Sequence, residues 1–424
     1  MEQEIEKYFD RLWPICRSIT GNGLRDSLNI LRELVPLELH EVPSGTPVFD
    51  WHIPREWNIK DAYIITPDGR KIADFKSNNL HVLNYSIPVN KELSFEELSP
   101  HLFSLPDMPD AIPYLTSYYK ETWGFCIQDK EKKALPTKGT YKAVIESSLT
   151  DGSLTYGDFL LEGDTEEEIL FSTYLCHPSM ANNELSGPLV TAYLYREVAA
   201  LRNRRYTYRF VFVPETIGAI AYLSRNGSRM KEKTAAGYVV TCVGDHGEFT
   251  YKRSKAGNTL ADRAAEHVLR SHKVKSRVID FAIGGSDERQ YCSPGFNLPV
   301  GSLMRTPYQQ YSQYHTSLDD KSFISFAAMA ESVGLYLEIV KTLELNRRYI
   351  NTQPYGEPQL GKRGLYADLG GQRKRSDALT RRLHLLCFAD GAHDLISIAE
   401  KMGLPATDFE STIAELTKAG LLKA

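Results

Sequence analysis

A strand that runs directly into a histidine is the feature that most constrains this chain. Residues 169–175 form a short, mostly apolar run rich in β-forming residues, which predicts a buried strand. His177 follows its end, the polar stretch 182–187 comes next, and the apolar run 188–194 predicts a helix. An α/β enzyme presents a metal site in this way, with a histidine at the end of a strand and polar ligands where the next helix starts.

The chain is too long for one compact core, because its 424 residues exceed the size at which a single core stops growing. Strand-like and helix-like runs alternate between residues 140 and 345, which favours an α/β sheet with sites at the ends of strands. A hairpin signal at residues 67–70 and dense prolines predict a small β-rich unit before them. We therefore predict a catalytic domain from residues 1–40 and 136–350, an inserted β-rich domain at 41–135, a linker at 351–378 and a winged-helix-like domain at 379–424.

The last part of the chain predicts three short helices. An amphipathic run at residues 379–388 is followed by a break, and two more helices flank the turn at residues 403–405. This pattern resembles a winged helix or helix-turn-helix unit. A surface that follows phosphates needs lysine and arginine, so we expect a packing or dimerisation module, with DNA binding as the less favoured alternative. The acidic residues that argue against DNA binding are Glu400, Asp408, Glu410 and Glu415.

The composition indicates the cellular compartment and the kinds of partner to expect. A net charge of -4 gives no general reason to expect nucleic acid or an anionic membrane as a partner. No apolar run approaches the ~20 residues that span a bilayer, and the N-terminus lacks a signal-peptide core. The 6 cysteines are scattered without a Cys-x-x-Cys pair, which predicts free thiols in a cytoplasmic protein and no cysteine metal site.

Two later segments carry residues suited to the same kind of site. His315 lies in a Tyr-His-Thr sequence before a long predicted helix, although a single histidine is more often structural than a ligand. Glu215 ends an apolar strand, where a carboxylate is unfavourable unless it is ligated, paired or catalytic. The alternative for Glu215 is a charge that stabilises the start of a helix through the helix dipole.

These residues together resemble the zinc aminopeptidases with a phosphorylase/hydrolase-like fold, a three-layer α/β domain. The pattern of that family is a first histidine, an Asp-Asn-x-Ser-Gly turn, a Glu-Glu-x-Gly pair, a later aspartate and a closing Tyr-His-Thr. More closely, the chain resembles bacterial aminopeptidase-like proteins that carry an inserted small domain of unknown function and a C-terminal winged helix. This resemblance covers nearly all of the chain and includes residues 214–218, 285–291 and 356–366.

The resemblance implies a role for five positions. His177 would be a zinc ligand, and Glu215 would be the general base that takes a proton from the metal-activated water. His315 would close the metal site. Asn183 stands where the family has a bridging aspartate, and Thr216 stands where a second glutamate binds zinc.

Departures from the family pattern change the expected metal content. A neutral Asn183 cannot balance the charge of two zinc ions as a bridging carboxylate does. The later aspartate is not matched cleanly, because Thr241 falls at its position; Asp245 is the nearest carboxylate. Glu184, beside Asn183, is a further candidate. We therefore expect one zinc ion, held by the two histidines with Asn183 or Asp245 as oxygen donor.

Two classes of function stay open. The first is a metal-dependent, aminopeptidase-like hydrolase of an amide or peptide bond, acting on a short peptide or a small molecule such as an amino-sugar precursor. Asp287 or Glu288 would then bind a free amino group of the substrate. The second is a regulatory or binding protein that kept the fold and lost the full metal set, in either case tied by the resemblance to surface-polysaccharide pathways.

Overall fold

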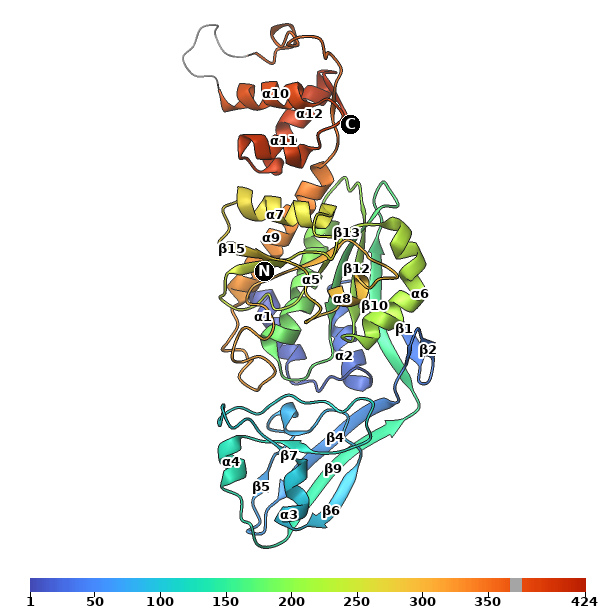
Figure 1. Cartoon of the computed structure of the whole chain (residues 1–424), viewed down its shortest axis with the longest axis vertical. Helices are drawn as coiled ribbons and strands as arrows, with labels where there is room; N and C mark the ends of the chain where they lie inside the picture. Colours follow the sequence, from blue (N-terminus) through green and yellow to red (C-terminus); the bar gives the residue numbers. More distant parts are fainter. Residues whose placement is uncertain (367–375) are drawn as a thin grey trace. The chain divides into compact units, whose positions relative to one another are not determined.

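The computed structural model describes residues 1–366 and 376–424. The chain forms two compact units, each with its own core (Figure 1). The first unit comprises residues 1–261 and 277–333, and the second comprises residues 262–276 and 334–424. None of the helices in these described parts of the chain is long and apolar enough to cross a lipid bilayer.

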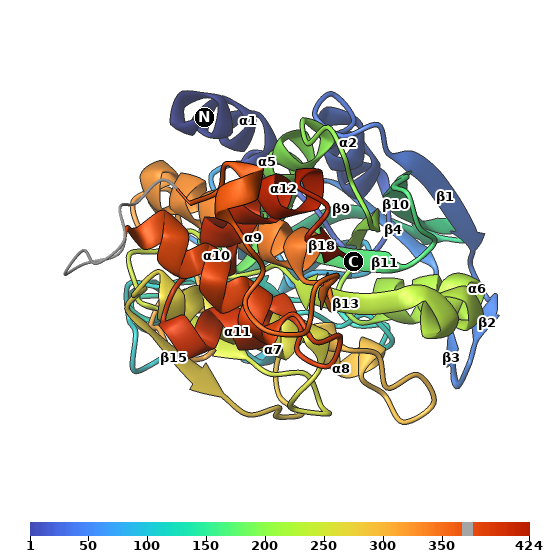
Figure 2. The ribbon, with the colours of Figure 1, turned by 90° about the horizontal axis from the view of Figure 1, so that it is seen from above.

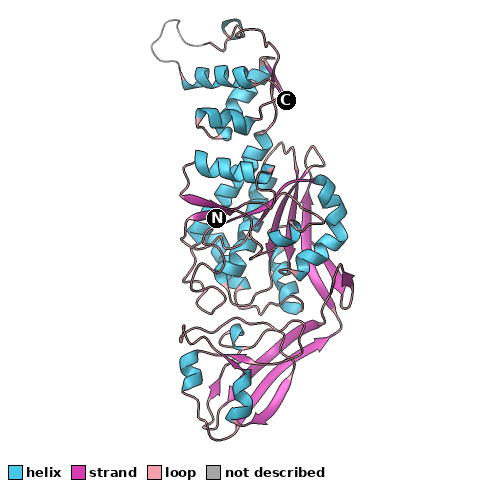
Figure 3. Cartoon of the chain, in the orientation of Figure 1, coloured by secondary structure: helices cyan, strands magenta, loops and turns pink. Residues whose placement is uncertain are grey.

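An eight-stranded mixed sheet forms the centre of the first unit (Figure 3). β11 (Glu168–Tyr174) lies between two neighbours and runs parallel to both. All of its residues are buried, which confirms the predicted strand and is typical of a sheet covered on both faces. In spatial order the strands are β1 (Glu38–Pro43), β10 (Ser153–Leu161), β12 (Thr207–Val213), β11, β13 (Thr234–Val239), β16 (Val300–Met304), β14 (Phe249–Lys252) and β15 (Ser276–Ile279).

Helices cover both faces of this sheet, as Figure 2 shows. α5 (Ser186–Ala199) connects β11 to β12 on one side, and α6 (Ile217–Lys233) connects β12 back across to β13. Right-handed crossovers that move in opposite directions along a sheet place their helices on opposite faces, so α5 and α6 enclose the central strands. The predicted α/β fold class is confirmed. The other helices of this unit include α1 (Glu2–Leu12), α2 (Asn22–Leu31), α8 (Glu288–Tyr291) and the first part of α9 (Phe326–Leu345).

A second, four-stranded antiparallel sheet belongs to the inserted part of the first unit. The predicted hairpin is present, because β4 (Glu56–Ile65) pairs with β5 (Lys71–Ile72). β4 also pairs over its length with β9 (Tyr141–Thr150), which in turn pairs with β6 (Val89–Leu93). The small sheet therefore extends beyond residue 135, where we expected the insertion to end. Short elements complete the insertion: β2 (Pro47–Val48), β3 (Trp51–His52), β7 (Leu102–Phe103), β8 (Phe125–Cys126), α3 (Phe95–Leu98) and α4 (Asp129–Lys133).

The second unit contains the three predicted C-terminal helices. They are α10 (Asp377–Phe388), α11 (Leu395–Met402) and α12 (Glu410–Lys418), and a short antiparallel pair joins β17 (Ile350–Asn351) to β18 (Leu422–Lys423). α7 (Leu260–Ser271) also contributes, through the ion pair of Arg263 with Asp394. Part of the predicted linker, residues 367–375, lies outside the described residues. The core of this unit includes Leu385, Leu395, Ile398, Phe409 and Leu416.

Candidate active site

A cavity of about 280 Å³ lies beside the ends of the central parallel strands. Cys176 and His177 follow β11, whereas Glu215 and Thr216 follow β12. His315 reaches the same cavity from the loop between β16 and α9. The carboxyl ends of neighbouring parallel strands meet at one edge of a sheet, so the fold brings the predicted segments together. The remaining wall comes mainly from the inserted part and consists of Ile19, Trp51, Tyr114, Thr116, Tyr118, Tyr119 and Ile217.

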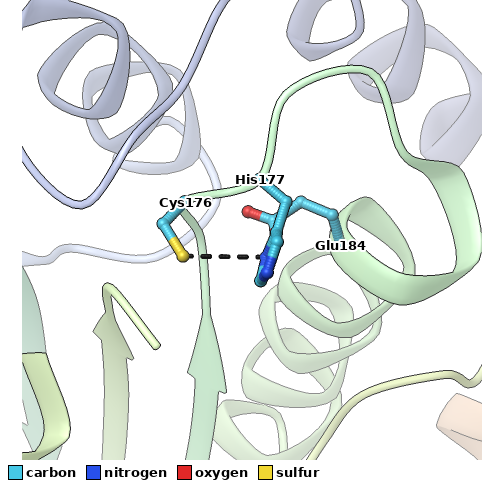
Figure 4. Close-up of side chains that lie close together, drawn as sticks. All are labelled: Cys176, His177 and Glu184. Carbon is cyan, nitrogen blue, oxygen red and sulfur yellow. Dashed lines mark hydrogen bonds and ion pairs between the residues drawn. The ribbon is translucent and has the colours of Figure 1, made fainter. Parts of the chain in front are cut away.

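The His177 imidazole is buried and oriented by Glu184. Its Nδ1 lies 2.6 Å from Glu184 Oε2, while its Nε2 lies 3.4 Å from Glu215 Oε2 (Figure 4 shows the His177 and Glu184 side chains). Burial lowers the pKa of His177 to about 3 and raises the pKa of Glu184 to about 8. His177 is therefore neutral. When its Nδ1 donates to Glu184, the Nε2 lone pair is free and faces Glu215. Metal-binding histidines are commonly oriented by a carboxylate in this way.

A buried arginine stands behind this pair. Arg17 Nε donates to the backbone oxygen of His177 at 3.2 Å and lies 3.8 Å from Glu184 Oε1. A positive charge beside Glu184 opposes the effect of burial on that carboxyl. Sequence reasoning missed Arg17, since nothing local in the chain signals a contact across 160 positions.

Cys176 shares the site but is not arranged as a nucleophile. Its Sγ lies 3.6 Å from His177 Nδ1, the nitrogen that Glu184 already occupies. In a catalytic triad the nucleophile and the carboxylate use different ring nitrogens. Burial also raises the pKa of the Cys176 thiol well above its ordinary value, which disfavours the thiolate. The ligand atoms of Cys176, His177 and Glu184 lie within 4.8 Å of one another, a grouping that sequence reasoning did not foresee.

The backbone directly after Glu215 is strained. Thr216 has a φ of 62°, an outlier for a β-branched residue, and it immediately precedes α6. Its N–H donates to Asp287 Oδ1 at 2.7 Å, and its Oγ1 accepts from Arg289 Nη2 at 2.8 Å. Burial raises the pKa of Glu215 well above its ordinary value, and the nearby Asp287 carboxylate adds to the effect. Glu215 nevertheless keeps contact with the cavity, because 24% of its side chain is exposed.

Both acidic residues that we expected to bind a substrate amine are buried and engaged inside the protein. Asp287 accepts the Thr216 N–H described above. Glu288 pairs with Lys252 at 2.6 Å and accepts from the Tyr308 hydroxyl at 3.0 Å. Neither lines the cavity, so the structure gives them a supporting position rather than one that contacts a substrate.

His315 faces His177 across the cavity. The centroids of the two rings lie 5.5 Å apart, and burial lowers the pKa of His315 to about 3. Its ring stacks on Tyr314 at 3.9 Å, and its backbone has a φ of 55°. Tyr114 lies edge-on to both imidazoles, with centroid distances of 4.9 and 5.2 Å. Two neutral imidazoles therefore converge beside Glu215.

The inserted part holds the His315 loop by backbone pairing. The Tyr114 N–H donates to the His315 oxygen at 2.8 Å, and Pro113 forms an isolated bridge with Thr316. The Ser317 N–H donates to the Ile112 oxygen at 2.9 Å, and Ser317 Oγ accepts from the Ile112 N–H at 3.0 Å. The sequence predicts that the inserted unit shapes the pocket, and the contacts of Tyr114 show how this unit reaches the His315 loop.

The two predicted oxygen donors lie in different surroundings. Asn183 Nδ2 donates to the Tyr174 hydroxyl at 2.9 Å, while its Oδ1 is buried and has no hydrogen-bond partner among the described residues. Asp245 accepts hydrogen bonds from Asn182 Nδ2 and Thr306 Oγ1, both at 2.8 Å. The hydrogen bonds of Asp245 hold a loop. Among the described residues, none of them reaches a predicted metal-binding histidine.

The groups that converge on the cavity suit a divalent metal ion. Two neutral imidazoles and one carboxylate are a donor set that zinc takes in catalytic sites. Asn183 does not line the cavity, but its unpartnered Oδ1 is a buried oxygen of the kind that a metal ion or a water satisfies. The residues present therefore fit a divalent metal ion such as zinc, although the Asp245 carboxylate is used elsewhere.

Comparison with known proteins places this site in a family. Residues 6–346 match the model of a domain of unknown function, DUF4910, and residues 347–424 match a winged helix-turn-helix model. The chain belongs to the DUF4910 family. The match to the winged helix-turn-helix model confirms the predicted C-terminal winged helix.

One relative of this DUF4910 protein comes from Clostridium acetobutylicum. It is 47% identical over 420 residues, which cover 99% of this chain and 96% of the relative, and it is provisionally named a polysaccharide biosynthesis protein with an aminopeptidase-like domain. A crystal structure of a protein from the same organism, provisionally described as a peptidase, has a TM-score of 0.93 at 46% identity and covers 100% of this chain and 96% of that chain.

More distant structures show the fold alone. BSAP, a zinc aminopeptidase from Bacillus subtilis, has a TM-score of 0.58 at 12% identity and covers 81% of this chain and 94% of its own. A peptidase M28 precursor from Shewanella amazonensis has a TM-score of 0.54 at 14% identity, with coverage of 80% and 91%. The predicted zinc-aminopeptidase-like fold of this DUF4910 protein is confirmed.

Proposed function

We propose that this chain is a metal-dependent hydrolase that cleaves an amide or peptide bond in the cavity beside His177 and His315. The observation that carries the proposal is the convergence of three groups from separate elements. His177 Nε2 lies 3.4 Å from Glu215 Oε2, and the two imidazole rings lie 5.5 Å apart. A metal ion, a base and a substrate carbonyl must meet at one point in such a reaction.

In this proposal His177 and His315 would hold one zinc ion together with an oxygen donor, for which Asn183 and Glu215 are the candidates. Zinc held there would supply Lewis-acid chemistry, which polarises a carbonyl oxygen and makes a water more acidic. Glu184 orients the His177 imidazole. Glu215 accepts the proton from the attacking water and returns it to the leaving nitrogen, the general acid–base role that the resemblance implies.

The walls of the cavity favour an uncharged group next to the bond that is cut. Tyr114, Tyr118, Trp51 and Ile217 line it with largely apolar surface. The name of the clostridial relative connects that protein with polysaccharide biosynthesis. We therefore propose that the substrate is a short peptide or a small molecule with an amide bond, including N-acylated or aminoacylated sugars.

The proposal is tested by metal content followed by turnover. The purified chain is dialysed, loaded with zinc and analysed for bound metal, and it is then assayed against aminoacyl amides, dipeptides and N-acyl amino sugars. We expect one zinc ion per chain and zinc-dependent release of amine from at least one of these classes. A chain that retains no zinc after supplementation contradicts the proposal.

A binding or regulatory protein on the same fold is the second candidate. The observation in its favour is that Asn183 and Thr216, both neutral, stand where the zinc aminopeptidases that this chain resembles carry carboxylates. This candidate predicts that the chain binds a ligand of the same substrate classes without converting it. Calorimetric binding together with complete recovery of the intact ligand would favour it over the hydrolase.

A further inference from the structure

We propose that Glu215 is itself a metal ligand, so that one ion is held by His177, Glu215 and His315. The resemblance assigns Glu215 only the role of a general base, which acts on water and does not touch the metal. The proposal rests on the proposed function, because it names a ligand of the same site.

The spacing of the donor atoms supports direct binding. Two ligands at about 2.0–2.2 Å from a zinc ion, separated by a tetrahedral angle, lie about 3.3–3.5 Å from each other. The distance between His177 Nε2 and Glu215 Oε2 is 3.4 Å. A carboxylate that reached the ion only through a water would stand further from it by one hydrogen bond, about 2.7 Å. The observed separation therefore suits two ligands of one ion.

The charge balance supports the same assignment. Glu215 is the one carboxylate among the described residues that line the cavity. The other nearby carboxylates are committed, Glu184 to His177 Nδ1 and Asp287 to the Thr216 N–H. A dication that is held only by neutral imidazoles and a neutral amide oxygen in a largely buried site lacks a compensating charge.

The local backbone holds Glu215 in place for this role. The strained Thr216 turn follows it directly and is secured by Asp287 and Arg289. The Glu215 N–H also donates to Cys176 Sγ at 3.3 Å, which ties the end of β12 to the end of β11 beside His177. Such strain persists where the surroundings over-determine it, typically at functional sites. With Oε2 bound to the ion, Oε1 stays available for the proton transfer proposed above.

The test is zinc affinity, measured by competition with a chelator on the full-length chain. Glu215→Gln keeps the shape of the side chain and removes its charge. Glu92→Gln makes the same change at an exposed position of β6 and serves as the matched control. We expect Glu215→Gln to weaken zinc binding by more than about 100-fold, beyond the 10–100-fold typical of a group that only supports a ligand. Glu92→Gln should bind as the wild type does.

Glu215→Asp keeps the charge but shortens the side chain, and we expect an affinity between those of the wild type and Glu215→Gln. Thermal unfolding of the metal-free variants checks that each one folds. If Glu215→Gln and the wild type bind zinc equally, the ligand role is overturned while the proposed hydrolase stands. If the wild type binds no zinc, the proposed function fails and the ligand assignment fails with it.

Discussion

Each unit of the chain contains a carboxylate with a basic partner, and the two pairs differ in what surrounds them. In the first unit, burial raises the pKa of Glu184 to about 8, although His177 lies 2.6 Å away. In the second unit, burial acts on Asp394 in the same direction, but the hydrogen bonds of Arg263 and Ser397 outweigh it and lower the pKa.

The difference lies in how completely each charge is compensated. Asp394 accepts two hydrogen bonds of 2.7 Å from the Arg263 guanidinium and two more from the N–H and hydroxyl of Ser397. Glu184 has one short contact with a neutral imidazole, and its Oε1 has no hydrogen-bond partner among the described residues. Satisfied pairs are typical of structure, whereas an under-compensated acid beside a cavity is typical of a functional site.

The largest expected effect is the loss of turnover in Glu215→Gln. An amide cannot accept the proton, and a general base contributes roughly 10²–10⁴-fold to a rate. The measurement is kcat at saturating zinc, on whichever substrate class the wild type converts. Full activity in this variant would show that Glu215 is not the general base.

Glu184→Gln should reduce zinc affinity by about 10–100-fold, because an amide replaces the carboxyl group that orients the His177 imidazole. Chelator competition measures this effect, and Glu92→Gln again serves as the matched control. Unchanged zinc affinity would mean that Glu184 has a structural role only, as Asp394 does. The contrast between the two acids would then be wrong.

Asp394→Asn should lower the unfolding free energy by about 1–2 kcal/mol at pH 7, since the pair is only partly buried and solvent screens it. The folded pKa of Asp394 is lowered, so its contribution is present above the unfolded pKa of about 3.9 and is lost as the pH falls through the folded value. In denaturant titrations the difference between the wild type and the variant should therefore be smaller at pH 3 than at pH 7, because pH 3 lies below the unfolded pKa. A constant difference would show that charge is not the cause.

Asn183→Asp should raise zinc affinity by several-fold, because zinc prefers an anionic oxygen to a neutral amide oxygen. The unpartnered Oδ1 is the atom expected to gain the contact. Competition with a chelator measures the change against the wild type. Equal affinities would place Asn183 outside the reach of the metal.

The smallest expected effect concerns the winged helix, which should show no tight binding to duplex DNA. α12 (Glu410–Lys418) begins with an acidic residue, and Glu415 on the same helix pairs with Arg382. Phosphate contacts need cationic side chains and make binding depend steeply on salt. Binding can be measured by fluorescence anisotropy. A salt-sensitive dissociation constant well below the ~10⁻⁶ M of non-specific binding would contradict this expectation.

Local patterns in the sequence were sufficient to predict several of the strands and the winged helix, and they selected the candidate site residues. The apolar run of β11 predicts a strand covered on both faces, and every residue of that strand is buried. His177 and Glu215 could be selected because each directly follows such a strand, and the ends of parallel strands converge. These inferences depend on near neighbours in the chain, which the order of residues specifies.

Only the tertiary structure revealed the contacts that support and enclose the site. Arg17 reaches Glu184 and His177 from the N-terminal segment, and Tyr114 reaches His315 from the inserted part. Asp245, which follows a strand as the predicted ligands do, turns instead towards Thr306 and its own loop. The reason is that strand order and loop direction join residues far apart in the chain, and no periodicity in the sequence records which of them will meet.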